Sequence, residues 1–215
     1  MNSAAKAYVA DFYAREDGLA DTRAALEAAV TGTLESYAKG GKLLTAGNGG
    51  SAADAEHITG ELLKSFRCRR PLSAAFAAEY ERLFGGEPLP AGLEGSLPAI
   101  FLGGNFAVAT AIVNDLGGEA LFAQQAMGLC AAGDVLLCVS TSGDAKPLLA
   151  AMRVAKAKRC TCVALTGRGG GAMRALADVC IQAPAEETYL VQEQHIKLYH
   201  TYCAAIEAHY WGSCQ

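Results

Sequence analysis

The sequence lacks several features that would fix a compartment or a class of partner. Although 52% of its 215 residues are hydrophobic, no uncharged apolar run approaches the roughly 18 residues that span a bilayer. Lys and Arg (18) do not outnumber Asp and Glu (22), so the net charge of −4 gives no general attraction to nucleic acid or an anionic membrane. The first residues meet charges early and lack a signal segment. We therefore expect a cytoplasmic protein without membrane or nucleic-acid partners.

The sequence also lacks any CxxC pair among its eight cysteines. Four of the cysteines lie in or beside apolar, strand-like runs: Cys138, Cys160, Cys162 and Cys180. Buried cysteine behaves as a small apolar residue, whereas a disulfide framework belongs to oxidising compartments. The pattern favours buried, reduced thiols.

The order of apolar patterns predicts an α/β fold. The length suits a single domain, residues 1–215, whose first 40 residues carry apolar side chains at helical spacing and predict one or two amphipathic helices. Short apolar runs then alternate with helical segments, which is typical of a parallel sheet covered by helices. In such sheets ligands bind at the carboxyl ends of the strands. The predicted strands are 42–46, 97–102, 135–140, 161–166 and 179–182.

Residues 73–96 interrupt this alternation. They predict a short helix that ends at Gly85-Gly86 and then a loop rich in proline and glycine. We interpret the inserted segment as a surface elaboration, with a lid or an inter-subunit contact as the alternative.

A glycine-rich turn, Gly47-Asn48-Gly49-Gly50-Ser51, follows the first predicted strand and opens a helix. Glycine permits a tight turn, and the free N–H groups at a helix start favour an anion. Alone the signal is weak, because such turns often only connect a strand to a helix. The spacing matches neither dinucleotide nor Walker loops, so nucleotide binding is not indicated.

A second candidate loop, Ser140-Thr141-Ser142-Gly143, follows the third predicted strand. Its three consecutive hydroxyls exceed what one helix cap needs, which favours phosphate recognition over simple capping. Asn114-Asp115 comes at the end of an apolar helical stretch. This pair could bind sugar hydroxyls or merely cap and turn.

Two helical motifs carry candidate acid–base groups. His57 and Glu61 are four residues apart, and Gln192 and His200 are eight apart, so each pair can share one helix face. A lone histidine in an apolar helix is usually structural, but here His200 accompanies the other three candidates. We assign His195, His209 and the tyrosines Tyr80, Tyr189, Tyr199, Tyr202 and Tyr210 to packing.

These segments, in this order, resemble the sugar isomerase (SIS) domain and, within it, the phosphoheptose isomerases. The resemblance covers nearly the whole chain except 73–96 and runs through GNGGSAADAEHITGEL, IVND, GDVLLCVSTSG, VALTGRGGGAMRALADVCI and VQEQHIKLYH. It implies a three-layer αβα sandwich with a five-stranded parallel sheet, assembled as a homotetramer with active sites between subunits. It implies a zinc ion on His57, Glu61, Gln192 and His200. With the adjoining Ser51 of the glycine turn, the implied sugar-phosphate contacts are Asn48, Gly49, Gly50, Asn114, Asp115, Ser140, Thr141, Ser142 and Gln192.

The reaction implied by the resemblance is conversion of sedoheptulose 7-phosphate to D-glycero-D-manno-heptose 7-phosphate. This aldose–ketose isomerisation proceeds through an enediol and needs two acid–base groups, which the resemblance assigns to Glu61 and His200. General acid–base catalysis of this kind contributes about 10²- to 10⁴-fold.

The chain departs from the pattern of the phosphoheptose isomerases at two positions, and three alternative functions stay open. Ala145 stands where many relatives place another phosphate-loop serine, and Tyr189 stands where they often place an acidic residue.

One alternative function is that of a non-catalytic SIS protein that regulates by binding a replication initiator. Such relatives lack the glutamate and the last histidine that this chain keeps as Glu61 and His200, which favours an isomerase. The others are a phosphosugar-binding sensor and an isomerase for a different phosphosugar.

Overall fold

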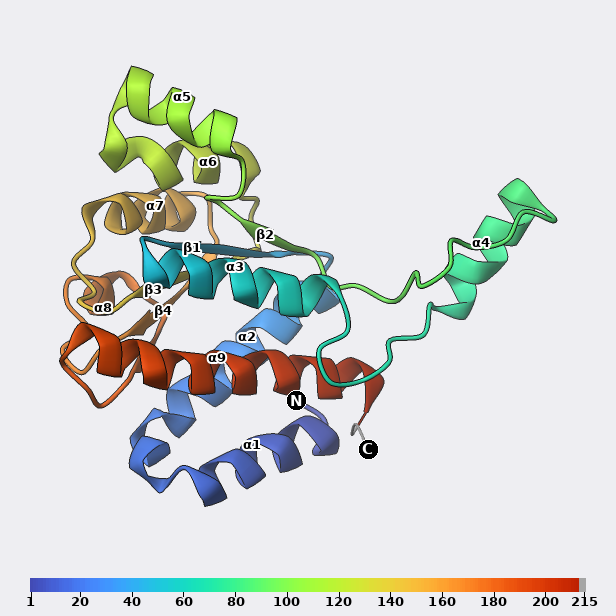
Figure 1. Ribbon diagram of the computed structural model, residues 1–215, viewed down its shortest axis with the longest axis horizontal. Helices are drawn as coiled ribbons and strands as arrows, with labels where there is room; N and C mark the ends of the chain where they lie inside the picture. Colours follow the sequence, from blue (N-terminus) through green and yellow to red (C-terminus); the bar gives the residue numbers. More distant parts are fainter. Residues whose placement is uncertain (213–215) are drawn as a thin grey trace.

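The computed structural model describes residues 1–212, in which helices surround one sheet (Figure 1). Each expected helical or strand-like segment has a counterpart. In chain order the elements are α1 (Ser3–Arg15), η1 (Asp17–Thr22), α2 (Arg23–Ala38), β1 (Leu43–Gly47), α3 (Gly50–Leu63), α4 (Ala74–Phe84), β2 (Ala99–Phe101), α5 (Phe106–Leu116), η2 (Gly118–Ala120), α6 (Leu121–Leu129), β3 (Val135–Ser140), α7 (Lys146–Ala157), β4 (Thr161–Thr166), α8 (Met173–Leu176), β5 (Val179–Gln182) and α9 (Thr188–Trp211).

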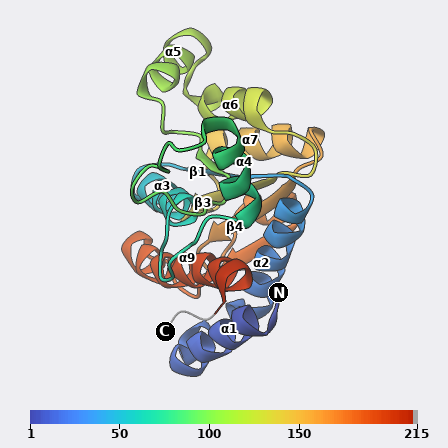
Figure 2. The ribbon, with the colours of Figure 1, turned by 90° about the vertical axis from the view of Figure 1, so that its right-hand side faces the viewer.

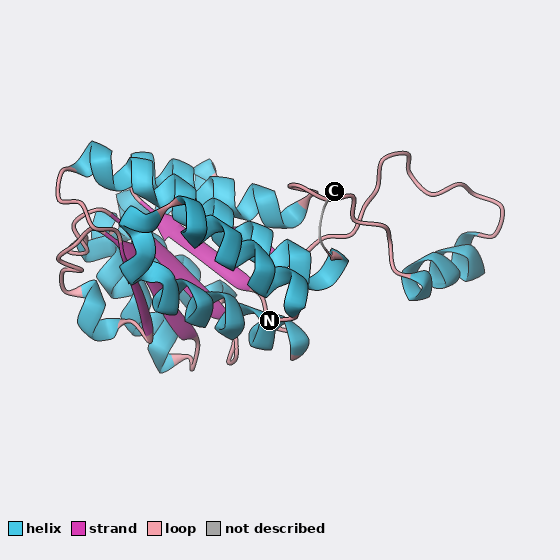
Figure 3. Cartoon of the chain, turned by 90° about the horizontal axis from the view of Figure 1, so that it is seen from below, coloured by secondary structure: helices cyan, strands magenta, loops and turns pink. Residues whose placement is uncertain are grey.

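The sheet is entirely parallel and has the strand order β2-β1-β3-β4-β5. Figure 3 shows its strands between layers of helices, which confirms the predicted three-layer αβα sandwich. The bounds of β3, β4 and β5 equal the predicted ones, while β1 begins one residue later and β2 is shorter.

Alternate strand residues build two separate cores on the two faces of the sheet. Leu43 and Val135 face a core that includes residues of α1, α2, α3 and α9. Leu44 and Leu136 face the opposite core, with residues of α6 and α7. The helices that carry His57, Glu61 and His200 therefore cover one face together.

The N-terminal segment 1–40 forms two helices joined by η1, as predicted. Helix α1 packs on α9. The hydroxyls of Thr33 in α2 and Tyr202 in α9 lie 2.6 Å apart in the buried core. The N-terminal helices therefore help to hold α9 in place.

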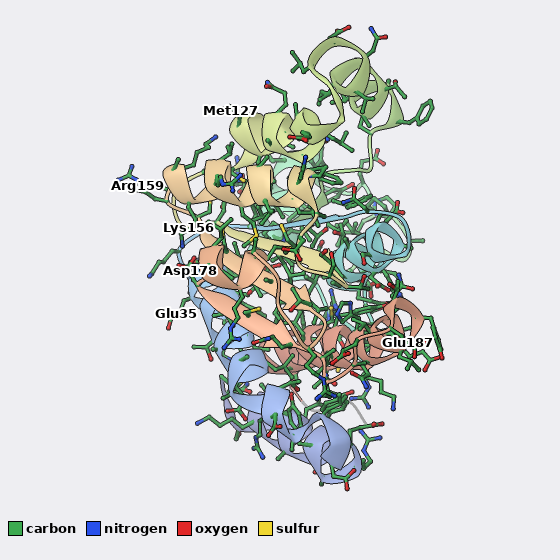
Figure 4. The ribbon with its side chains drawn as sticks, turned by 90° about the vertical axis from the view of Figure 1, so that its left-hand side faces the viewer. Glu35, Met127, Lys156, Arg159, Asp178 and Glu187 are labelled. Carbon is green, nitrogen blue, oxygen red and sulfur yellow. The ribbon has the colours of Figure 1, made fainter. Side chains whose placement is uncertain are left out.

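Two ion pairs lie at the amino ends of the strands. At the amino end of the strands, Lys42 Nζ donates to Asp134 at 2.6 Å, and Asp134 is 2% exposed. Lys156 of α7 donates to Asp178 at 2.7 Å, and Figure 4 shows this pair at the start of β5. Both contacts lie away from the carboxyl ends of the strands.

The inserted segment 73–96 extends away from the body (Figure 1). Ser73 caps α4 by accepting from the Phe76 amide, and none of the residues of α4 is buried. The predicted helix ending at Gly85 is confirmed. Its role as elaboration, lid or contact stays open.

Most of the cysteine prediction is confirmed. Free thiols are found at Cys138, Cys160, Cys162 and Cys180, as well as at Cys130 and Cys203. Cys68 is disulfide-bonded, so the expectation of reduced thiols is wrong there. Within residues 1–212, no helix combines the length and apolar character needed to cross a membrane.

Candidate active site

The loops that follow β1, β3 and β4 leave the sheet together at the carboxyl ends of these central strands. Gly47 of β1 pairs with Val139 of β3, and Ser140 pairs with Thr166 of β4. The glycine turn and the serine loop therefore start at the same level on neighbouring strands. This is the edge where parallel α/β sheets bind ligands, as the sequence predicted.

The glycine turn forms a tight strand-to-helix connection. Gly49 has a φ of +56°, a left-handed conformation that favours glycine, and α3 begins at Gly50. A Cβ at Gly47 would collide with the Ser51 backbone. No side chain caps this helix start, so its first N–H groups remain suited to an anion.

The serine loop is held by its own hydrogen bonds and by its neighbour. Ser140 Oγ accepts from the Gly143 amide, and Ser142 Oγ accepts from the Asp144 amide, both at 3.2 Å. Thr141 O accepts from the Gly167 amide at 3.0 Å. Ser142 is exposed. Because their O–H groups can still donate, the held hydroxyls of Ser140 and Ser142, with Thr141 between them, can serve as donors.

The predicted acid–base residues meet where α3 and α9 run side by side (Figure 1). His57 Nε2 and Glu61 Oε1 are 2.9 Å apart, and Glu61 is 8% exposed. The rings of His57 and His200 have centroids 5.1 Å apart. The Gln192 amide lies against Gly50, so closely that a Cβ there would collide with it. His57, Glu61 and His200 thus lie together between α3 and α9, while Gln192 lies beside the glycine turn at the start of α3.

His200 is set up to be neutral. Its Nε2 is buried and has no hydrogen-bond partner, and the ring of Phe66 lies 5.3 Å away. Burial lowers the pKa of His200; nearby His57 lowers it further, against the opposing effect of Glu61. A neutral imidazole can take up a proton from one atom and deliver one to another.

Tyr199 is a site residue that the sequence reasoning assigned to packing. Its hydroxyl lies 3.0 Å from His57 Nδ1, and burial raises the pKa of Tyr199, which keeps it protonated. Asp54 lies beside it: burial raises the pKa of Asp54, against lowering by Tyr199 and His57. No spacing in the sequence pairs Tyr199 with His57, because the two residues stand on different helices.

The zinc ligands implied by the resemblance are His57, Glu61, Gln192 and His200. Within residues 1–212, no group of three or more His, Cys, Asp and Glu side chains is arranged to hold a metal ion. His57 Nε2 and Glu61 Oε1 contact each other instead. The donor types nevertheless fit zinc, since imidazole and carboxylate are ordinary zinc ligands, and the buried His200 Nε2 lacks a partner.

Asn114 and Asp115 lie apart from this cluster. Both are exposed near the end of α5, where Asn114 Nδ2 donates to Asp115 Oδ1 at 2.7 Å. Helix α5 packs on α6 and η2, and Figure 2 shows it at one end of the molecule, with the sheet between it and α9. Their predicted contact with substrate stays a prediction.

Comparisons with known proteins agree with this arrangement. Two family models, each described as SIS domain, match residues 101–210 and 7–86. A phosphoheptose isomerase of Burkholderia pseudomallei is 41% identical over 196 residues, which is 90% of this chain and 87% of that protein. That of Aneurinibacillus thermoaerophilus is 37% identical, over 85% and 80%. This chain belongs to the phosphoheptose isomerase family.

Solved phosphoheptose isomerases have the same fold. The structure from Neisseria gonorrhoeae gives a TM-score of 0.73 at 30% identity and covers 94% of this chain and 96% of its own. That from Francisella tularensis gives 0.72 at 30% identity, with 96% and 98% covered. The likeness therefore extends over both the sheet and the helices that carry the site.

The two departures from other phosphoheptose isomerases lie at helix starts. Ala145 is the N-cap of α7 and, lacking an oxygen, makes no side-chain cap. Tyr189 is the second residue of α9 and is 59% exposed. Both positions lie at helix starts that follow the carboxyl ends of strands.

Proposed function

We propose that this phosphoheptose isomerase converts sedoheptulose 7-phosphate to D-glycero-D-manno-heptose 7-phosphate in the cytoplasm. The observation that carries the proposal is the meeting of a carboxylate, Glu61, and a neutral imidazole, His200, around His57 where α3 packs on α9. The similarity to phosphoheptose isomerases of several bacteria supports the choice of substrate.

In this proposal the phosphate binds where the two loops meet. The amides at the start of α3 and the hydroxyls of the serine loop donate to its oxygens. The contacts would come from Asn48, Gly49, Gly50, Ser51, Ser140, Thr141 and Ser142. Asn114, Asp115 and Gln192 would contact the sugar.

The chemistry would move one proton between neighbouring carbons. Glu61 removes a proton from C1 of the ketose to give an enediol and returns a proton to C2. His200, neutral at pH 7, gives a proton to the oxygen on C2 and takes one from the oxygen on C1, so the oxygen proton moves in the same direction as the carbon proton. The burial of Glu61 and of His200 Nε2, with the Phe66 ring against His200, keeps bulk water from competing for these protons.

We also propose one zinc ion per site, held by His57, Glu61, Gln192 and His200. When bound, zinc would polarise the carbonyl and stabilise negative charge on the enediol oxygens.

We also propose that the chain assembles as a homotetramer. Large exposed apolar side chains on α5, such as Phe106 (81% exposed) and Leu116 (58%), support burial against another subunit.

Replacing the carboxylate tests the catalytic assignment. Glu61→Gln keeps the shape but removes the base, so we expect turnover to fall by about 10²- to 10⁴-fold while the circular dichroism spectrum stays unchanged. Purified wild type and variant would be assayed with sedoheptulose 7-phosphate and with six-carbon phosphosugars. Normal activity of Glu61→Gln would refute the assignment, and binding without turnover by the wild type would favour a sensor.

Chelation tests the zinc proposal. Dialysis against a chelator should lower activity, and added zinc should restore it, because the ion would stabilise charge at the reacting oxygens. Metal content would be measured by atomic spectroscopy alongside the assay. Activity indifferent to both treatments would remove the metal from the proposal.

A further inference from the structure

A fully buried ion pair lies directly behind the proposed acid–base groups. Arg70 Nε donates to Glu207 Oε1 at 2.8 Å, and the exposed fractions of the two residues are 1% and 0%. Burying an ion pair carries a large desolvation cost, and well-packed apolar residues often stabilise a fold equally well. Such a pair is therefore weak evidence of a role in stability alone.

Arg70 holds the end of α3, the helix that carries Glu61. Its Nη2 donates to the Glu61 carbonyl at 2.6 Å, and its Nη1 donates to the Leu62 carbonyl at 2.7 Å. Because α3 ends at Leu63, these are two of the last four carbonyls, which lack partners within the helix. The Trp211 ring, 4.8 Å from the guanidinium, holds its other side. The backbone of Glu61 is thus fixed by Arg70.

Glu207 holds the loop that lies against His200. Its carboxylate also accepts from the Phe66 and Arg67 amides, at 2.9 and 2.8 Å. Phe66 packs on the His200 ring. Glu207 itself stands on α9 seven residues after His200, almost two turns along the same face. One carboxylate therefore connects the base on α3, through Arg70, with the surroundings of the acid on α9.

We propose that Arg70 and Glu207 are positioning residues that set the separation of Glu61 and His200 in the isomerisation. In this role they do not contact the substrate. They act through the backbone of Glu61 and through the Phe66 ring that packs on His200. The inference rests on the proposed function and deepens it. A misplacement of about 1 Å can cost about 10²-fold in rate, so small changes in this pair should change kcat while phosphate binding at the serine loop continues.

Glu207→Gln and Arg70→Lys test this role. We expect kcat to fall by about 10- to 100-fold and KM to change by less than about twofold, because the phosphate loops stand on β1 and β3. The matched control is Asp134→Asn, which breaks the buried contact with Lys42 at the opposite edge of the sheet. The control should lower the melting temperature without changing kcat. Equal losses of kcat in Glu207→Gln and Asp134→Asn would overturn the inference.

A double variant separates positioning from general loosening. If Glu207 acts through the acid–base groups, Glu207→Gln added to Glu61→Gln should cause no further loss of kcat, since the group being positioned is already absent. Losses that multiply would overturn the inference. The wild type and Glu61→Gln in the same assay test the proposed function separately.

Imidazole signals in ¹⁵N-histidine-labelled protein give a readout that does not need turnover. Glu207→Gln should shift the signals of His57 and His200 and leave that of His195, whereas Asp134→Asn should shift none of them. Unchanged His200 signals in Glu207→Gln would contradict the inference even if no phosphosugar is turned over.

Discussion

Helices α9 and α4 contrast in what holds them. Half of the 24 residues of α9 are buried against α1, α2, α3 and the sheet, whereas none of the 11 residues of α4 is buried. A helix as short as α4 is marginal by itself in water, and its exposed side chains are joined mainly by local contacts such as Arg82–Glu79. The site helix is thus fixed by its own chain, while the inserted segment is not. Stability and activity should depend on the first and tolerate changes in the second.

The largest effect should follow from removing core volume beneath α9. Leu198→Ala deletes a side chain that is 0% exposed and should lower the free energy of unfolding by about 3 kcal/mol. For a chain of this size the melting temperature should fall by about 6–12 °C, measured by circular dichroism. A shift below 1 °C would show that α9 is not held as described.

A smaller effect should come from acid. His195 of α9 is fully buried, and burial lowers its pKa to about 4. The unfolded chain binds this proton below about pH 6.5, but the folded chain does so only near pH 4. The unfolded state therefore gains protons first as the pH falls, and stability decreases. This group alone should cost about 2 kcal/mol at pH 5 relative to pH 7.

Urea unfolding at pH 7 and pH 5 measures this dependence, with His195→Gln as the control. The control removes the titrating group, so its stability should change less between the two pH values. Equal pH dependence of wild type and control would contradict the role given to His195.

The smallest effect should come from α4. Leu83 is 54% exposed, so Leu83→Ser should change the free energy of unfolding by less than about 0.5 kcal/mol and leave kcat unchanged. Thermal unfolding, the isomerase assay and light scattering check this. A loss of kcat would favour the lid, and a smaller assembly would favour the inter-subunit contact.

The fold was predictable because the central strands β1, β3 and β4 are buried on both faces. Continuous apolar runs such as Val135–Ser140 stand out from their surroundings in sequence. The helix 74–84 was also predictable, since Ser73 and Gly85 mark its ends. Only the edge strand β2 was overestimated in length: the apolar pattern continues on both sides of it, but the flanking Pro98 and Leu102 make only one backbone hydrogen bond each to β1.

The site was predictable where its residues lie on one element. His57 and Glu61 share a helix face at a spacing of four, and their contact follows from helix geometry. Arg70, Glu207 and Tyr199 were not predictable. A charged side chain in a linear pattern resembles a solvated one, and only the packing of α3 on α9 shows that Arg70 and Glu207 are buried partners. Similarly, the distance from Tyr199 to His57 depends on tertiary structure.

Gly50 leaves room for the amide of Gln192 to touch the turn that opens α3. In the proposed isomerase, this contact joins the phosphate-binding glycine turn to α9, the helix that carries His200. The packing of α3 on α9 sets the separation between the turn and the acid–base groups, and that separation would limit how many carbons can lie between the phosphate and the carbonyl of the sugar.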